Sequence, residues 1–194
     1  MMSEVSELQK GMASAWFMSL RDDIVAEFER LEDTHSSGPF SDCAKGEFEV
    51  SKTKRHAEDD QDAGGGLMSV LRGGRVFEKV GVNVSTVHGE LGEQAQNAMA
   101  ARKSIAGMKE DPRFWASGIS LVAHMQNPHC PAVHMNTRMF WTPHAWWFGG
   151  GTDLNPCLEY DDDTAHFHDT LKMALDSHDT RLYQELKVWA DEYF

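Results

Sequence analysis

The spacing of apolar residues predicts a long helix near the start of the chain. Over residues 4–32, apolar side chains recur every three or four positions with charged residues between them, which is the period of an amphipathic helix. Leu8, Met12, Leu20 and Phe28 belong to this stripe. We expect the helix to pack on a core, because packing alone accounts for such a pattern.

The next segment, residues 33–63, has a different composition and predicts mostly loop. Residues 35–39 combine His, Ser, Gly and Pro, whereas residues 48–50 suit a short strand. Residues 52–62 are mostly charged, and we expect a solvated charged loop there. Binding of an anion by the basic residues of this run is the alternative.

Alternation of polar and apolar residues predicts a β-hairpin after the triple glycine at residues 64–66. Residues 67–71 and 76–87 form its strands, and the Gly-Gly pair within residues 72–75 supplies the positive φ angles of a tight turn. One face of the return strand carries Val76, Val80, Val82 and Val84, and the other carries Lys79, Asn83 and Ser85 around Gly81. Solvent and the lining of a cavity are equal alternatives for what this polar face meets.

The rest of the chain predicts three further strands between helices. The expected elements are a helix at 90–108, strands at 117–124, 133–141 and 145–149, and two helices, one from residue 161 and one over 179–194. The triple glycine at 149–151 predicts the end of the third strand, because consecutive glycines favour loops. The last helix lacks a glycine cap and a basic last turn, so we expect the sequence to be C-terminally incomplete.

The composition fits one domain over residues 1–194. Of these residues 41% are hydrophobic and 25% are charged, which is enough apolar material for a core. The net charge of −13 argues against nucleic acid or an anionic membrane as a partner. We find no membrane span and no signal peptide and expect a cytoplasmic protein, in which the three widely spaced cysteines stay reduced.

Candidate chemistry concentrates on the two central strands of the second half. If residues 117–124 pair with residues 133–141, strand alternation brings one set of polar side chains onto a single sheet face. The set is Ser120, His124, His134, Asn136 and Arg138. Arginine beside histidine is suited to gripping carboxylates, whereas an ordinary hairpin with an exposed polar face is the alternative.

Three further features lie close to these strands in the sequence. Asp153 follows the triple glycine and either accepts hydrogen bonds from a bound ring or forms a turn. The aromatic run 146–148 is either core or a flat surface beside the site. His124, His134 and His168 would supply three imidazoles to a metal, but their spacing matches no compact metal motif.

Five long stretches of the sequence match one family in the same order. They are residues 73–91 (GGRVFEKVGVNVSTVHGEL), 111–141 (DPRFWASGISLVAHMQNPHCPAVHMNTRMFW), 146–156 (WWFGGGTDLNP), 163–168 (DTAHFH) and 182–194 (LYQELKVWADEYF). On these motifs the chain resembles the oxygen-dependent coproporphyrinogen-III oxidases of the alphaproteobacterial type. The resemblance implies an α+β fold, in which helices cover both faces of a large, flat antiparallel β-sheet.

The resemblance also implies an activity. It is the oxidative decarboxylation of two propionates of coproporphyrinogen III to vinyl groups, which gives protoporphyrinogen IX in haem biosynthesis. Molecular oxygen is the co-substrate, a divalent metal cation is a candidate cofactor, and no flavin, haem or nicotinamide is expected. Members of the family act as homodimers, and their sequence continues past the position of Phe194. We therefore expect this chain to be inactive or to aggregate unless the remainder is supplied.

Residue roles follow from the resemblance position by position. His134 and Asp153 take the catalytic roles of proton donor and base. The substrate-binding positions are Ser120, Asn136, Thr137 and Arg138, and the metal ligands are His124, His134 and His168. A non-catalytic tetrapyrrole-binding protein is the alternative function. A metal-dependent hydrolase is not favoured, because no water-activating Glu accompanies the histidines.

Overall fold

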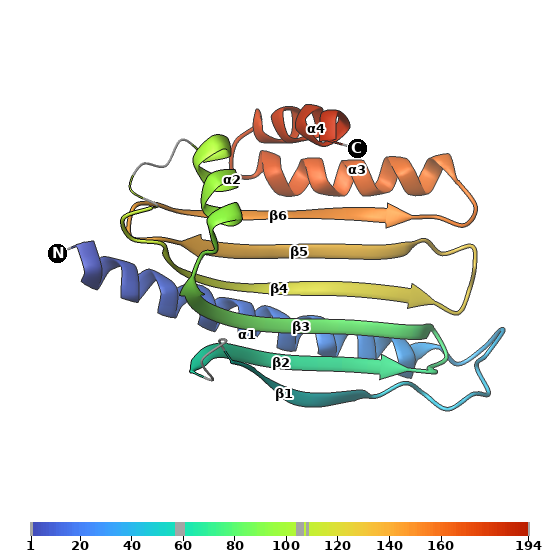
Figure 1. Ribbon diagram of the computed structural model, residues 1–194. Helices are drawn as coiled ribbons and strands as arrows, with labels where there is room; N and C mark the ends of the chain where they lie inside the picture. Colours follow the sequence, from blue (N-terminus) through green and yellow to red (C-terminus); the bar gives the residue numbers. More distant parts are fainter. Residues whose placement is uncertain (1, 57–60, 104–106, 108, 194) are drawn as a thin grey trace. The chain divides into compact units, whose positions relative to one another are not determined.

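The computed structural model describes residues 2–56, 61–103, 107 and 109–193 (Figure 1). The elements in order are α1 (Met2–Thr34), β1 (Phe48–His56), β2 (Asp62–Arg72), β3 (Phe77–Glu90), α2 (Glu93–Lys103), β4 (Arg113–Met125), β5 (Ala132–Trp141), β6 (Trp146–Asn155), α3 (Asp161–Asp176) and α4 (Leu182–Tyr193). The expected α+β class with a large antiparallel sheet is confirmed. The chain divides into two compact units, one ending at Asn155 and one beginning at Pro156.

The first unit is built on a six-stranded sheet in which every strand pairs with its neighbours in sequence, in the order β1-β2-β3-β4-β5-β6. All five pairings are antiparallel. The β2–β3 connection is the tight turn expected from the Gly-Gly pair. Gly73 has a φ of 63°, a conformation that side-chain-bearing residues adopt with strain.

One face of the sheet is covered by α1, which packs on β3 and β4 (Figure 1). We call it the helix face. The buried apolar side chains of this face include Leu71, Val80, Val82, Ile119, Ala123 and Met139, and Phe17 of α1 closes over them. Their alternation with polar residues along β3 and β4 confirms the faces predicted from the sequence, except that Val76 precedes its strand.

The end of α1 is tied to the β2–β3 turn by Glu32, whose side chain is fully buried. Its carboxylate accepts four backbone N–H bonds, from Gly46 at 2.9 Å, Arg75 at 2.6 Å, Val76 at 3.0 Å and Phe77 at 2.9 Å. The turn fits closely around it, since a Cβ on Gly74 would lie 2.2 Å from Glu32 Oε1. Glu32 is therefore a buried charge that the backbone solvates in place of water.

A second polar anchor joins the middle of α1 to β2. Arg21 Nε and Nη2 both donate to the buried Ser69 hydroxyl, at 3.0 and 2.9 Å. Arg21 Nη1 also forms an ion pair with the exposed carboxylate of Asp22. Arg21 and Glu32 therefore attach α1 to the sheet at two points, one in the middle of the helix and one near its end.

Three strands differ from the sequence expectations. β2 begins at Asp62, so the triple glycine at 64–66 lies within the strand and not before it. The charged run expected as a loop enters β1, which extends to His56 as an almost fully exposed edge strand. Charged side chains on an exposed edge strand oppose its pairing with other chains. Residues 57–60 of that run lie outside the described residues. The triple glycine at 149–151 does not end β6, which continues through it to Asn155.

The second unit is a pair of helices, α3 and α4, that pack on each other. Its internal contacts include a 3.1 Å hydrogen bond between Tyr183 Oη and His168 Nδ1. The three aspartates at the start of α3 stabilise the helix through its dipole, as expected from the sequence. Among the helices that the structure describes, none combines the length and the apolar composition that crossing a membrane requires.

Candidate functional site

The face of the sheet opposite α1 carries most of the candidate residues, and we call it the polar face. The strand register arranges them in rows that run across β3 to β6. One row is Asn83–Ser120–Asn136–Gly151, the next toward the β4–β5 loop is Gly81–Val122–His134–Asp153, and the next in the other direction is Ser85–Gly118–Arg138–Gly149. The pairing of β4 with β5 therefore brings the expected polar set together.

His134 and Asp153 form a hydrogen-bonded pair at the centre of this face. His134 Nδ1 and Asp153 Oδ1 lie 3.0 Å apart, on adjacent positions of β5 and β6. Asn155 Nδ2 donates to the same carboxylate oxygen and lies 3.2 Å from His134 Nδ1. With Nδ1–H donating to Asp153, Nε2 of His134 is the nitrogen left to exchange a proton with a ligand.

Half of each side chain in this pair is open to solvent, since 42% of His134 and 50% of Asp153 is exposed. A ligand lying on the face therefore reaches both groups without any movement of the backbone. Sequence reasoning selected the two residues separately. It did not find their contact, which depends on the register of β6 beyond the triple glycine.

A second imidazole lies beside the pair. The rings of His124 and His134 are perpendicular, with centroids 6.1 Å apart. In the part of the first unit that the structure describes, no third His, Cys, Asp or Glu joins them in a metal-binding group. Two imidazoles on adjacent strands are donors that a divalent transition metal accepts, so His124 and His134 fit part of the expected ligand set. His168, the other expected ligand, belongs to α3 of the second unit.

Arg138 is exposed on the polar face, one row from Ser120 and Asn136. Its Nη1 lies 3.4 Å from Asn136 Oδ1, a weak contact that leaves the guanidinium free to bind a carboxylate. Thr137 lies between these two residues, so its side chain is on the helix face. The structure thus places Asn136 and Arg138 together, and the Thr137 side chain away from them.

Glycines keep the polar face bare around these side chains. Gly118 and Gly149 flank Arg138, and Gly151 flanks Asn136. A Cβ on Gly149 or Gly151 would meet nothing within 4 Å, whereas one on Gly118 would lie 2.6 Å from the Cβ of Arg138. Gly149 and Gly151 are therefore not needed for packing; they leave a flat, open surface.

Aromatic rings close one end of this surface. Phe114, Phe140 and Trp147 form a continuous stack across β4, β5 and β6, with centroid distances of 5.7 and 5.0 Å. Trp146 and Phe148 lie on the helix face instead and remain 47% and 57% exposed. The interpretation of residues 146–148 as core is therefore wrong for these two rings.

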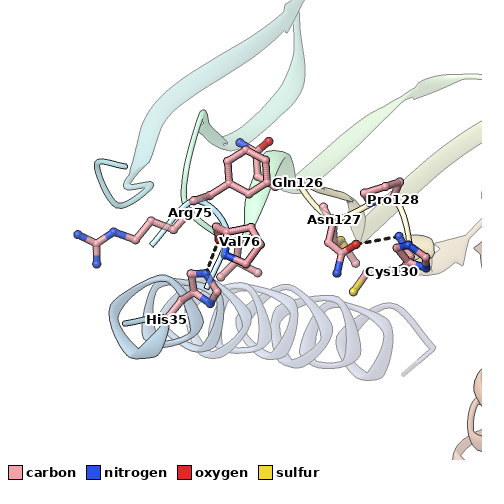
Figure 2. Close-up of a pocket in the computed structure, with 11 residues that line it drawn as sticks. His35, Arg75, Val76, Gln126, Asn127, Pro128 and Cys130 are labelled. Atoms are coloured by element: carbon pink, nitrogen blue, oxygen red, sulfur yellow. Dashed lines mark hydrogen bonds between the residues drawn. The ribbon is translucent and has the colours of Figure 1, made fainter. Parts of the chain in front are cut away.

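A pocket of about 550 Å³ lies elsewhere on the first unit, where the end of α1 and the 35–40 loop meet the β2–β3 turn and the β4–β5 loop. Figure 2 shows His35, Val76, Asn127 and Cys130 around it. Its visible polar groups already pair locally, as His35 Nε2 does with the Pro39 carbonyl at 2.9 Å. None of the candidate residues lines this pocket, so the candidate site is the open polar face.

We predict that Gly151→Val prevents a flat ligand from lying on the polar face without unfolding the protein. The valine would add apolar bulk beside Asn136 where no protein atom lies within 4 Å. If the face takes the flat tetrapyrrole that the resemblance implies, we expect at least a tenfold rise in the Kd of coproporphyrin, measured by fluorescence titration, and a thermal midpoint within about 3 °C of the unaltered chain. Gly92→Val, at another open position, is the control. Unchanged binding in Gly151→Val would contradict this use of the face.

Comparison with known proteins gives one consistent family. Residues 12–194 match the family described as coproporphyrinogen III oxidase. The oxygen-dependent coproporphyrinogen-III oxidase of Rickettsia bellii is 43% identical over 190 residues, and that of Rickettsia akari is 41% identical over 185. These alignments cover 98% and 95% of this chain, but 63% and 61% of the relatives. The chain thus spans less than two thirds of the length of these relatives.

Proposed function

The chain belongs to the coproporphyrinogen III oxidase family, and from this premise we propose that its polar face binds coproporphyrinogen III for oxygen-dependent oxidative decarboxylation. In each of two rounds, one propionic acid side chain and one O₂ give a vinyl group, CO₂ and H₂O₂, and the final product is protoporphyrinogen IX. The observation that carries the proposal is the placement of Arg138 and the His134–Asp153 pair on one open, glycine-floored face.

Each residue has a role that its position supports. Arg138 binds a propionate through its free guanidinium, and Ser120 and Asn136 offer hydrogen bonds from the row beside it. Asp153 accepts hydrogen bonds from pyrrole N–H groups and acts as the base that activates the ring toward oxygen. His134, positioned by Asp153, exchanges a proton with the substrate through Nε2. Thr137 contributes backbone geometry between Asn136 and Arg138.

Holding the substrate still is the main task of the protein in this reaction. The reduced tetrapyrrole is itself electron-rich, so the chemistry needs a fixed orientation and a placed base more than a strong electrophile. A flat ring over Gly149 and Gly151 would keep its N–H groups near Asp153 while its side chains reach Arg138. The aromatic stack at the end of the face offers a further apolar contact for the macrocycle.

We extend the proposal to the setting of the reaction. If a divalent cation binds here, His124 and His134 would hold it, and Nε2 of His134 would then bind the cation in place of exchanging a proton; the cation would supply charge stabilisation near the substrate. O₂ is the only oxidant required, without flavin, haem or nicotinamide. The protein works in the cytoplasm as a homodimer. Metal content of the purified protein and its mass in solution test the first and the last of these statements.

The proposal predicts that protoporphyrin forms from coproporphyrinogen III in air and that Arg138→Ala lowers its rate at least tenfold. Fluorescence of the oxidised product measures turnover. The assay uses this chain alone and the chain joined to the rest of the Rickettsia bellii relative, of which it covers 63%. Lys54→Ala, on the exposed edge strand, is the matched control for loss of a cation. Porphyrin binding without turnover in either form would support the binding-only alternative and contradict the oxidase.

A further inference from the structure

Beyond the His134–Asp153 pair, the polar face carries two more basic residues. The register joins Arg72 of β2, Lys79 of β3 and His124 of β4 in one row, next to the row of His134. Arg72 and Lys79 are both exposed. Over the part of the chain that the structure describes, neither makes an ion pair with a carboxylate.

Their position relative to Arg138 is set by the sheet itself. Lys79 lies opposite His124, six residues along β4 from Gly118, which is opposite Arg138, and β5 lies two strand spacings from β3, with β4 between them. With about 3.4 Å per residue and about 4.8 Å per strand, their Cα atoms are about 20 Å apart along the strands and about 10 Å across them. Both long side chains can bend inward over the rows of Ser120 and His134 that lie between them.

Basic residues at the two ends of the open polar face match a flat ligand that carries carboxylates on opposite sides. Arg138 alone fixes one edge of such a ligand and leaves the ring free to pivot about that edge. A second charged contact removes the pivot and sets which part of the ring lies over Asp153. Lys79 and Arg72 are placed for this contact, because they extend the same face beyond the catalytic pair.

We propose that Lys79, with Arg72 beside it, binds a second carboxylate of the substrate, at the opposite end of the polar face from Arg138. The inference rests on the proposed function and adds a specificity-determining pair to it. It gives a reason for product release: the substrate carries four carboxylates and the product two, so the product cannot use both ends of the face as well as the substrate does. Net affinity therefore favours the tetracarboxylic ligand.

The test is a fluorescence titration of the chain with coproporphyrin III, which has four carboxylates, and with deuteroporphyrin, which has two. We expect Lys79→Met to raise the Kd of coproporphyrin about tenfold, to flatten its dependence on salt, and to change the Kd of deuteroporphyrin by less than about threefold. Lys79→Arg keeps the cation and should restore tight binding. Lys54→Met on β1 is the charge-matched control.

The outcomes separate this inference from the proposed function. If Arg138→Ala weakens coproporphyrin binding and Lys79→Met does not, the proposed binding of a second carboxylate by Lys79 is wrong and the proposed site stands. If Lys79→Met weakens both porphyrins equally, or if Lys79→Arg fails to restore binding, the effect is structural and the inference is overturned. Absence of both porphyrin binding and turnover, also in the chain joined to the rest of the Rickettsia bellii relative, contradicts the proposed function itself.

Discussion

Replacing Glu32 with leucine should lower the free energy of unfolding by about 3–5 kcal/mol, which is the cost of removing one partner from a buried, charged hydrogen-bond network. The change leaves four backbone N–H groups of the 46 and 75–77 segments without an acceptor, in a place that water does not reach. Glu32→Gln keeps an acceptor oxygen but loses the charge, and it should cost about 1–3 kcal/mol. Urea unfolding followed by circular dichroism measures both.

The same residue should make the protein sensitive to acid. Burial by itself raises the pKa of Glu32, but the four N–H donors outweigh burial and hold the pKa below its ordinary value of 4.5. A lowered pKa in the folded state means that Glu32 contributes stability above about pH 4.5 and that this contribution fades as the pH falls through the folded value. The unaltered chain should therefore lose more stability between pH 6 and about pH 3 than Glu32→Gln does.

Glu27→Gln provides the comparison for both experiments, because Glu27 is exposed and pairs with Arg30 of its own helix. It should change the free energy of unfolding by less than about 0.5 kcal/mol. A Glu32→Leu protein as stable as Glu27→Gln would show that the buried carboxylate does not hold the helix to the turn.

Asp153→Asn should reduce turnover about 10²- to 10⁴-fold while leaving stability almost unchanged. The asparagine cannot act as a base, and it can present its NH₂ group to His134 Nδ1, which would shift the imidazole to the other tautomer. Because half of the Asp153 side chain is exposed, no buried charge is lost. Initial rates of protoporphyrin formation, measured at saturating coproporphyrinogen III, give the effect on kcat.

Coproporphyrin binding separates chemistry from recognition in this variant. We expect the Kd of coproporphyrin for Asp153→Asn to rise by less than about tenfold, since Arg138 and the open surface over Gly149 and Gly151 remain. Asp162→Asn, at an exposed position in the first turn of α3, is the control. Full turnover in Asp153→Asn would remove Asp153 from the reaction and leave His134 as the residue to examine.

Much of the fold was predictable because α1 and strands β3 to β5 follow simple periods. The alternation at Val80 and Val82 arises from one buried face, and Leu20 and Phe28 bring their part of α1 onto the core. The prediction was wrong for the first turns of the stripe, since Leu8 and Met12 are each 65% exposed. The predictions failed where an element has no buried face. The segment after Lys52 is an edge strand, so burial imposes no pattern on it, and its charges indicated a loop.

β6 was missed beyond Gly149 for a different reason. Glycine normally weakens a strand, and three in succession indicate a turn. Here pairing with β5 holds the backbone extended, and Gly150 lies so close to it that a Cβ would be 2.3 Å from the Asn136 carbonyl oxygen. A local preference was thus overruled by a contact between strands, which no local pattern reveals.

The candidate site was predictable in its members and not in its geometry. Alternation along β4 and β5 was enough to place Ser120, Asn136 and Arg138 on one face. The contact between His134 and Asp153 needed the register of β6, which the sequence pattern had ended too early. Glu32 left no signal at all, because a glutamate in an amphipathic helix is normally assigned to solvent.

The sequential strand order has a consequence for how the first unit forms. Because each strand pairs with its chain neighbour, most of the sheet closes through short loops, the arrangement that favours rapid folding among β-rich proteins. Each new strand can pair with the preceding strand during synthesis. The contacts of α1 with the sheet span far more chain: Ser14 meets Ser117 across 103 residues. The helix leaves the ribosome before the strands do and cannot dock fully until β4 has been made.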